Sequence, residues 1–264
     1  MDLFKMIEKG QKVLIGMIHC LPLPGTHGAT ATIDQVIARA VSDAKLLEES
    51  GFDAVMVENE DSGVASHMTK VQYAGMSMVA QAVRSAISIP MGLCCGCLNY
   101  EEALSICKVA GGSFFRAPIF VDTVMNYNGI IEPCSPQILA YRKQIGAENI
   151  RILADVQVKY YYMVNPNIPV TQSARWAAKQ GADAVIVTGT ASGAETSMND
   201  LQQAKNSISI PVVVGSGVTV NNITQQMEIA DILIIGTTLR KDGKMSEPID
   251  PVQAKAIVAA ARGQ

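Results

Sequence analysis

Val212-Val213-Val214-Gly215-Ser216-Gly217 is a run of β-branched residues that ends abruptly in small ones. A short, continuous apolar run of this kind is typical of a strand buried on both faces, as in a parallel sheet. Seven further runs of similar character occur along the chain. The eight predicted strands are Val13–Ile18, Ala54–Glu58, Met91–Cys95, Ser113–Arg116, Arg151–Asp155, Ala184–Thr188, Val212–Gly215 and Asp231–Ile235.

Longer segments with helical periodicity alternate with these runs. From Ile33 to Leu47 apolar residues recur at the spacing of one helix face, and Gly51 is placed to end that helix. The other predicted helices are Tyr73–Ala86, Tyr100–Ala110, Ser135–Gln144, Thr171–Gln180, Ser197–Lys205, Asn221–Glu228 and Pro251–Ala261. Eight strand–helix units predict an α/β protein with a single (β/α)₈ TIM barrel over residues 1–264, because such barrels have about 250 residues. A doubly wound parallel sheet is the alternative, although it usually has fewer units.

The composition excludes several classes of protein. Hydrophobic residues make up 48% of the chain and charged residues 17%, which is too apolar for a disordered chain. The net charge is −3 without a Lys/Arg cluster, so no nucleic-acid partner is expected. The mean hydropathy is +0.21, but no apolar run approaches the roughly 20 residues of a membrane span. The N-terminal segment lacks the features of a signal peptide, so a cytoplasmic protein is expected.

The chain has six cysteines, and all are expected to be free thiols because nothing indicates export. Cys94, Cys95 and Cys97 lie close together but lack the C-x₂-C spacing and the second ligand pair of structural zinc sites. If the strand alternation continues, Cys95 and Cys97 face the same way. A nucleophilic thiol would need a neighbouring base, so packing in the core is the simpler interpretation.

Small residues follow the last three predicted strands. Loops after strands seven and eight form the usual phosphate site of TIM barrels, and glycines let backbone N–H groups approach an anion closely. The predicted phosphate-binding residues are Gly189, Ser192, Gly193, Gly215, Ser216, Gly217, Gly236, Thr237 and Thr238. Asn221-Asn222 is expected to begin a helix whose positive end adds to the field, with charge from Arg240 or Lys241 nearby. The alternative is that these loops only turn the chain.

Charged residues end several other predicted strands, where TIM barrels have their active sites. The predicted catalytic residues are His19, Glu58, Arg116, Asp155 and Lys159. If the fifth strand continues, Asp155 and Lys159 point to one side of the sheet. Lys159 would then act as a base or form a Schiff base, oriented by Asp155; a structural ion pair is the alternative. The long segment Ala117–Pro136 is a candidate lid over this face.

No cofactor is predicted, and the pattern does not favour a metal. His19, His67 and Glu58 would be the ligands of a divalent ion, but the chain has neither an H-x-H nor an H-E-x-x-H pattern. The two common nucleotide-binding patterns are also incomplete. Gly215-Ser216-Gly217 lacks the third glycine of a dinucleotide fingerprint, and Gly236 to Lys244 has the wrong spacing for a P-loop.

Several motifs together resemble one known family. They are Gly16–Gly25, Asp53–Asn59, Ile130–Glu132, Ile152–Lys159, Val187–Gly193, Gly215–Val218 and Lys241–Gly243. In this order they span nearly the whole chain and resemble the BtpA/SgcQ-like family. The sequence departs from the family pattern at Asp61–Val64, Gly92–Asn99, Arg116–Pro118 and Tyr160. These departures lie at the expected catalytic face. They are consistent with a substrate different from that of other family members.

The resemblance implies a barrel similar to the ribulose-phosphate-binding group, which commonly forms homo-oligomers. We therefore expect a protein that binds a phosphorylated small molecule such as a sugar phosphate, with isomerase, epimerase or aldolase chemistry. Two alternatives stay open. One is a non-enzymatic assembly factor, since the family is named for a cyanobacterial protein needed for photosystem I accumulation. The other is the nucleoside triphosphatase activity with which some members are labelled.

Overall fold

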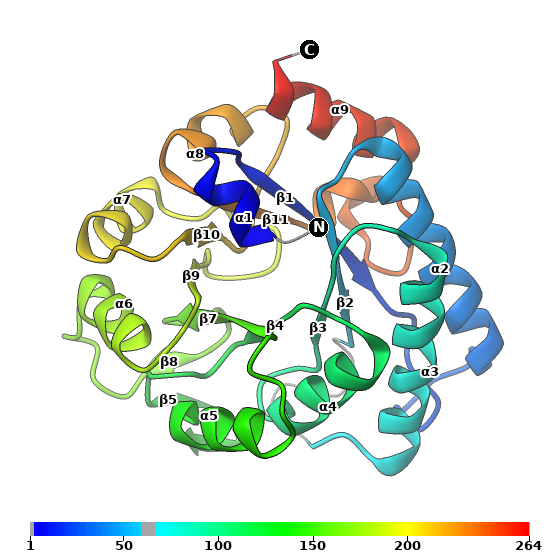
Figure 1. Ribbon diagram of the computed structural model, residues 1–264, viewed down its shortest axis with the longest axis horizontal. Helices are drawn as coiled ribbons and strands as arrows, with labels where there is room; N and C mark the ends of the chain where they lie inside the picture. The colour runs from blue at the N-terminus through cyan, green and yellow to red at the C-terminus, as the bar shows by residue number, and fades with distance from the viewer. Residues whose placement is uncertain (1–2, 60–66, 264) are drawn as a thin grey trace.

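Eight parallel strands close into a barrel in the computed structural model, which describes residues 3–59 and 67–263 (Figure 1). Around the barrel the strands follow one another in chain order, and the last pairs with the first. They are β1 Val13–His19, β2 Ala54–Glu58, β3 Met91–Cys94, β4 Phe114–Ala117, β7 Arg151–Val156, β9 Ala184–Val187, β10 Val212–Val214 and β11 Ile232–Ile235. The predicted (β/α)₈ TIM barrel is therefore confirmed, and all eight predicted strands are present.

Helices surround the barrel on its outside (Figure 1). They are α2 Ile33–Ser50, α3 Lys70–Ala86, α4 Tyr100–Ala110, α5 Ser135–Gln144, α6 Val170–Lys179, α7 Met198–Ser207, α8 Ile223–Ile229 and α9 Pro251–Arg262. A capping box formed by Thr32 and Gln35 begins α2. Gly51 ends the helix in the left-handed conformation, and this end was predicted from the sequence. Among the described residues, no helix is long and apolar enough to cross a membrane.

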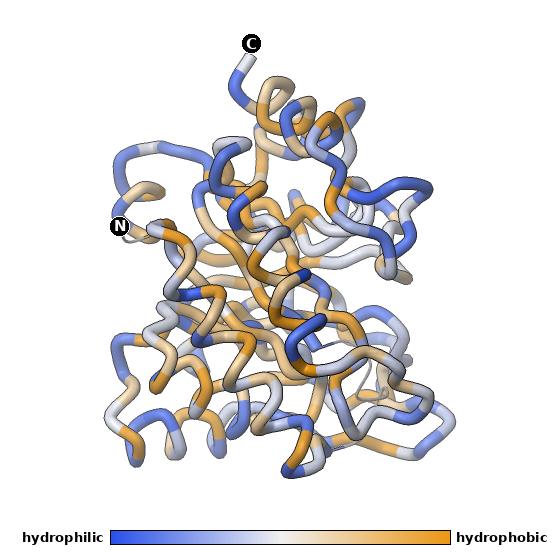
Figure 2. The backbone as a smooth tube through the Cα atoms, turned by 90° about the vertical axis from the view of Figure 1, so that its right-hand side faces the viewer, coloured by the Kyte–Doolittle hydropathy of each residue, from blue (hydrophilic) through white to orange (hydrophobic). Residues whose placement is uncertain are grey.

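Apolar side chains fill two separate layers. One layer lies between the strands and the outer helices, and the other fills the inside of the barrel. Phe114 occupies much of the inside, and it does so because Gly92 on the next strand has no side chain. A Cβ at Gly92 would lie 2.1 Å from the Phe114 ring. In Figure 2 the hydrophobic segments accordingly run through the middle of the molecule and the hydrophilic ones lie at its outer turns.

A short helix that the sequence did not predict, α1 Leu3–Glu8, precedes the first strand. Leu3 belongs to the apolar cluster inside the barrel, and Phe4, Met6 and Ile7 pack against that cluster. Because α1 leads into β1, it covers the amino-terminal end of the barrel.

A small antiparallel sheet accompanies the loops after β4 and β7. It contains β5 Val124–Asn126, β6 Gly129–Ile131 and β8 Tyr162–Met163, in the order β6-β5-β8. The segment expected to be a lid thus contains a hairpin of β5 and β6. Its strand β5 also pairs with β8, which comes from the loop after β7. Ile119, Val124 and Val158 form a small apolar cluster of their own beside it. After β11 the chain makes two 3₁₀ turns, η1 Thr237–Leu239 and η2 Lys241–Gly243.

Candidate functional site

A small cavity of about 30 Å³ lies at the carboxyl ends of the strands. Four of the predicted catalytic residues, His19, Glu58, Arg116 and Lys159, line it. All the predicted phosphate-binding residues except Gly189 line the same cavity, namely Ser192, Gly193, Gly215, Ser216, Gly217, Gly236, Thr237 and Thr238. The fold therefore brings His19 and Thr238, which lie 219 positions apart in the chain, to the same cavity.

Hydrogen bonds hold the loops after β9, β10 and β11 against one another. The N–H of Gly189 donates to the Ser216 hydroxyl at 2.7 Å, and this hydroxyl donates to the Ala194 carbonyl at 2.9 Å. The Thr238 hydroxyl donates to the Val218 carbonyl at 2.6 Å. The Gly189 N–H and the hydroxyls of Ser216 and Thr238 thus donate hydrogen bonds within the protein that hold the loops in place.

Several backbone donors in these loops are unused. Within the described part of the chain, the N–H groups of Gly193, Ser216, Gly217 and Val218 form no hydrogen bond. Ser216 and Val218 are buried, with exposed fractions of 6% and 2%. Buried backbone donors are nearly always paired, because an unpaired one costs about 1–3 kcal/mol. A group of them around one cavity is suited to an anion.

Gly217 is required by the shape of its loop. Its φ angle is +69°, and a Cβ there would lie 2.3 Å from the Cα of Glu195 and 2.5 Å from the Ala194 carbonyl oxygen. Only glycine combines a left-handed conformation with this close approach of two backbones. The glycine therefore lets the loops after β9 and β10 meet at the cavity.

Arg116, which lines the cavity, forms a buried ion pair with Asp155, which lies behind it. The guanidinium donates to both carboxylate oxygens at 2.8 Å, and the residues are 4% and 1% exposed. Burial raises the pKa of Asp155, and the charge of Arg116 opposes that rise. Burial would lower the pKa of Arg116, but the Asp155 carboxylate holds it well above its usual range. Since Asp155 does not line the cavity, its position suits the orientation of Arg116 rather than contact with a ligand.

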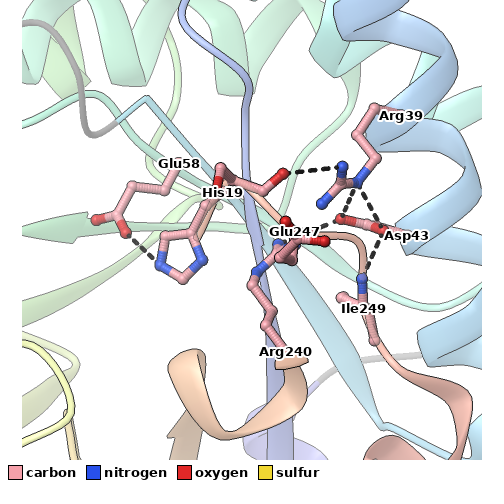
Figure 3. Close-up of polar contacts among 8 residues, drawn as sticks. His19, Arg39, Asp43, Glu58, Arg240, Glu247 and Ile249 are labelled. Carbon is pink, nitrogen blue, oxygen red and sulfur yellow. Dashed lines mark hydrogen bonds and ion pairs between the residues drawn. The ribbon is translucent and has the colours of Figure 1, made fainter. Parts of the chain in front are cut away.

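His19 and Glu58 face each other at the ends of β1 and β2 (Figure 3). His19 Nε2 lies 3.4 Å from Glu58 Oε2, and Arg116 Nη1 lies 3.9 Å from Glu58 Oε1. Burial lowers the pKa of His19 to about 4, so the ring is neutral at pH 7. Burial would raise the pKa of Glu58, but the charges of His19 when protonated, Arg116 and Lys159 hold it below its usual range. Glu58 is therefore an ionised carboxylate with a neutral imidazole beside it.

Lys159 reaches the cavity by a different route from the predicted one. The strand β7 ends at Val156, and Gln157 and Tyr160 both have positive φ angles, of 48° and 68°. The prediction that strand alternation places Asp155 and Lys159 on one side is wrong, because the chain turns between them. The turn nevertheless brings the half-buried Lys159 to the cavity, where its Nζ donates to the Ser192 hydroxyl at 2.8 Å.

The charges expected beside the phosphate loops are placed elsewhere. Arg240 is buried and binds Asp43, with its Nη2 3.2 Å from the carboxylate (Figure 3). Lys241 is exposed. Helix α8 has seven residues, Ile223–Ile229, and Asn222 is its N-cap, so the helix begins where the sequence predicts. The Asn222 amide donates to the Gly217 carbonyl at 2.9 Å and braces the loop. Among the described residues, Lys159 and Arg116 are thus the basic side chains, apart from the neutral His19, that line this cavity.

All six cysteines are free. Cys94 packs inside the barrel and Cys95 packs between strands and helices, whereas Cys97 packs against the small cluster beside β5. Because β3 ends at Cys94 and Gly96 has a φ of 79°, the prediction that Cys95 and Cys97 face one way is wrong. Burial raises the pKa of all three thiols, which argues against a nucleophilic role at neutral pH.

The described residues contain no group of three or more His, Cys, Asp or Glu side chains arranged to hold a metal ion. His19 and Glu58 are buried, whereas His67, the third expected ligand, is exposed. The segment Asp61–Val64, one of the departures from the family pattern, lies outside the described residues.

Comparison with known proteins identifies the family. Residues 10–263 match the model of the BtpA family. The chain belongs to the BtpA family. An uncharacterised protein of Methanocaldococcus jannaschii is 37% identical over 250 residues, covering 94% of each chain. The photosystem I biogenesis protein BtpA of Synechocystis is 29% identical over 98% of this chain and 91% of its own length.

A solved structure shares the fold. It is (S)-3-O-geranylgeranylglyceryl phosphate synthase from Thermoplasma acidophilum, in complex with sn-glycerol-1-phosphate. The TM-score is 0.67 with 14% sequence identity, and the alignment covers 100% of both chains. At this identity the likeness supports the barrel fold of the present chain and does not transfer an activity.

Proposed function

We propose that the cavity binds the phosphate group of a small molecule and that Glu58 moves a proton on the carbon skeleton of that molecule. The observation that carries the first part is the set of unused N–H groups at Gly193, Ser216, Gly217 and Val218 around one cavity. Lys159 and Arg116 line the same cavity and add positive charge beside these donors. The phosphate-bound fold neighbour supports the same ligand chemistry by analogy.

Lys159 supplies the positive charge in this proposal. Its Nζ is held by the Ser192 hydroxyl in a loop that contributes to the cavity, and the side chain is only half-buried. A lysine ammonium binds phosphate as a compact point charge, and it does not need the geometry of a P-loop. The backbone donors and Lys159 together would balance the charge of a phosphate monoester.

Glu58 is the proposed base. As an ionised carboxylate lining the cavity, it would take the proton from a carbon next to a carbonyl group. The electron pair of the broken C–H bond moves to the carbonyl oxygen, where Arg116 and Lys159 would stabilise the negative charge. Delivery of a proton to the same carbon from the opposite face, by a second proton donor, inverts that carbon, which is epimerisation. If the carbon bears a hydroxyl, its O–H proton moves to the former carbonyl oxygen and a proton is added to the former carbonyl carbon, which is isomerisation. The neutral His19 ring beside Glu58 would orient the carboxylate.

Lys159 offers a second chemical route at the same site. Its amine would condense with a ligand carbonyl, releasing water and forming an imine, as in class I aldolases. Borohydride reduces such an imine to a stable secondary amine, so mass spectrometry of Lys159 after borohydride treatment separates the aldolase route from simple proton transfer.

Solvent exchange tests the proposal. The protein is incubated in D₂O with phosphorylated ketones and aldehydes, and loss of the C–H signal is followed by NMR. We expect exchange that falls by about 10²–10⁴-fold in Glu58→Gln, the usual contribution of a positioned base. Glu148→Gln is the control, because Glu148 is exposed and lies before β7, at the opposite end of the barrel. Exchange that is equal in both variants would contradict the role of Glu58.

The name of the Synechocystis relative favours one rival, a factor in photosystem I biogenesis without catalytic activity. Under that alternative the cavity would still bind a phosphorylated ligand, but neither the unmodified protein nor Glu58→Gln would exchange C–H hydrogen with D₂O. The exchange experiment therefore also separates the enzyme from the assembly factor.

A further inference from the structure

A second cavity lies against the same charged side chains. It has a volume of about 80 Å³ and shares Glu58, Arg116 and Lys159 with the phosphate cavity. The two cavities therefore adjoin at the residues to which the proposed chemistry is assigned. A ligand whose phosphate occupies the first cavity extends naturally into the second.

The remaining wall of the second cavity is largely apolar. Cys94, Cys97, Pro118, Val158 and Tyr161 line it. Thiols pack as small apolar groups, and the Cys97 thiol is hydrogen-bonded to the Tyr161 side chain, which uses the polar ends of both. Cys97 and Tyr161 also pack against the apolar cluster that contains Val158, so the wall is backed by the small sheet.

One polar group in this wall has no partner. The Nδ2 of Asn59 is buried and forms no hydrogen bond with any described residue, and the residue as a whole is 1% exposed. Asn59 lines the second cavity, directly after Glu58 at the end of β2. A buried amide donor without a partner is costly, so a ligand that offers an acceptor there would bind more tightly.

We infer that the organic part of the phosphorylated ligand occupies this second cavity and is compact and largely apolar, such as an aromatic ring, with one hydrogen-bond acceptor for Asn59. The inference rests on the proposed phosphate site. The inference disfavours sugar phosphates with open polyol chains as ligands. Such a chain would place hydroxyls against Cys94, Pro118 and Val158, where they would lose water without gaining partners.

Titration calorimetry with three probes tests this inference on the unmodified protein. The probes are inorganic phosphate, glycerol 1-phosphate and phenacyl phosphate, which carries an aromatic ring and a carbonyl acceptor. We expect phenacyl phosphate to bind at least tenfold more tightly than glycerol 1-phosphate. Equal binding of the two, or tighter binding of glycerol 1-phosphate, would overturn the inference.

Cys97→Leu adds a test inside the protein, because the larger side chain fills the cavity from its wall. We expect it to weaken phenacyl phosphate binding at least tenfold and to leave inorganic phosphate binding within twofold. Cys97→Ala is the matched control, since it keeps the cavity open, and it should retain the preference for phenacyl phosphate. A loss that is equal for both probes would contradict the assignment of the cavity. If Cys97→Leu does not fold, the three-probe comparison decides alone.

Binding of inorganic phosphate distinguishes a failure of the proposed phosphate site from a failure of the inference about the organic part of the ligand. If it does not bind, the proposed phosphate site fails and the inference fails with it. If it binds but phenacyl phosphate has no advantage over glycerol 1-phosphate, only the inference about the organic part is overturned.

Discussion

Arg116 and Asp155 are joined by two hydrogen bonds of 2.8 Å at a position where neither residue is more than 4% exposed. The pair connects β4 and β7 and holds the guanidinium beside Glu58, 3.9 Å away. A buried pair of this kind fixes the direction of a charged group, which is the requirement for stabilising charge that develops during a reaction.

Breaking this pair is expected to affect folding first. Asp155→Asn removes the nearer counter-charge of the buried Arg116 and leaves Glu58, 3.9 Å away, so the free energy of unfolding should fall by about 3 kcal/mol, the lower end of the range for a broken buried pair. Urea denaturation measures the change. Lys205→Met is the control, because the Lys205–Asp231 pair is partly exposed and such pairs contribute about 0–1 kcal/mol. Equal effects of the two variants would show that the Arg116–Asp155 pair does not hold the barrel mouth.

His19 predicts how stability depends on pH. Its pKa is about 4 in the folded protein and 6.5 when exposed, so below pH 6.5 the unfolded chain takes up a proton that the folded chain does not. Stability is then lost as the pH falls from about 6.5 to about 4, by about 3 kcal/mol in total. His19→Gln should remove this part of the pH dependence. If both proteins lose stability equally between pH 6.5 and 4, the ring is not buried in its neutral form.

Lys159 is expected to serve function and not folding. Lys159→Met keeps most of the apolar stem but removes the charge and the bond to Ser192. The free energy of unfolding should change by less than about 1 kcal/mol, while ligand turnover falls by orders of magnitude. Lys179→Met on the outer surface of α6 is the control and should change neither. An unfolded Lys159→Met protein, or one with full activity, would argue against this role.

Thr237 allows a cleaner test of the phosphate loops than their glycines do. A side chain at Gly217 would collide with the backbone of Glu195 and disturb the loop itself, whereas Thr237 already has a side chain lining the cavity. Thr237→Glu places a carboxylate where the anion is expected. It should remove the rise in melting temperature that inorganic phosphate gives, because only ligand bound to the native state stabilises it. Thr237→Val, which is similar in shape and uncharged, should retain most of the rise.

The barrel could be predicted from sequence because each strand consists mainly of a short apolar run, and Gly51 marks a helix end. The helix α1 and the sheet β6-β5-β8 were missed. Their elements have two to six residues, too few for a period to be visible, and β5, β6 and β8 are largely exposed.

The sequence predicts which residues form the candidate site better than it predicts how they are arranged. Residues at strand ends meet because a closed barrel brings them to one rim. The chain turns between Asp155 and Lys159 at Gln157, a non-glycine residue with positive φ that no local sequence pattern predicts. Arg240 could not be assigned because its partner, Asp43, is 197 residues away. Asn59 directly follows Glu58, but the sequence does not indicate a role for it. Only the structure shows that its amide Nδ2 is buried without a hydrogen-bond partner.

The position of a bound anion tests the central claim most directly. Crystals grown or soaked with inorganic phosphate are the material for this measurement, and the phosphorus atom is located in the electron density. We predict one anion in the cavity lined by Gly193, Gly217 and Thr237, within hydrogen-bond distance of the unused N–H groups and of Lys159. An anion bound elsewhere, with these loops turned apart and Lys159 directed into solvent, would contradict the account.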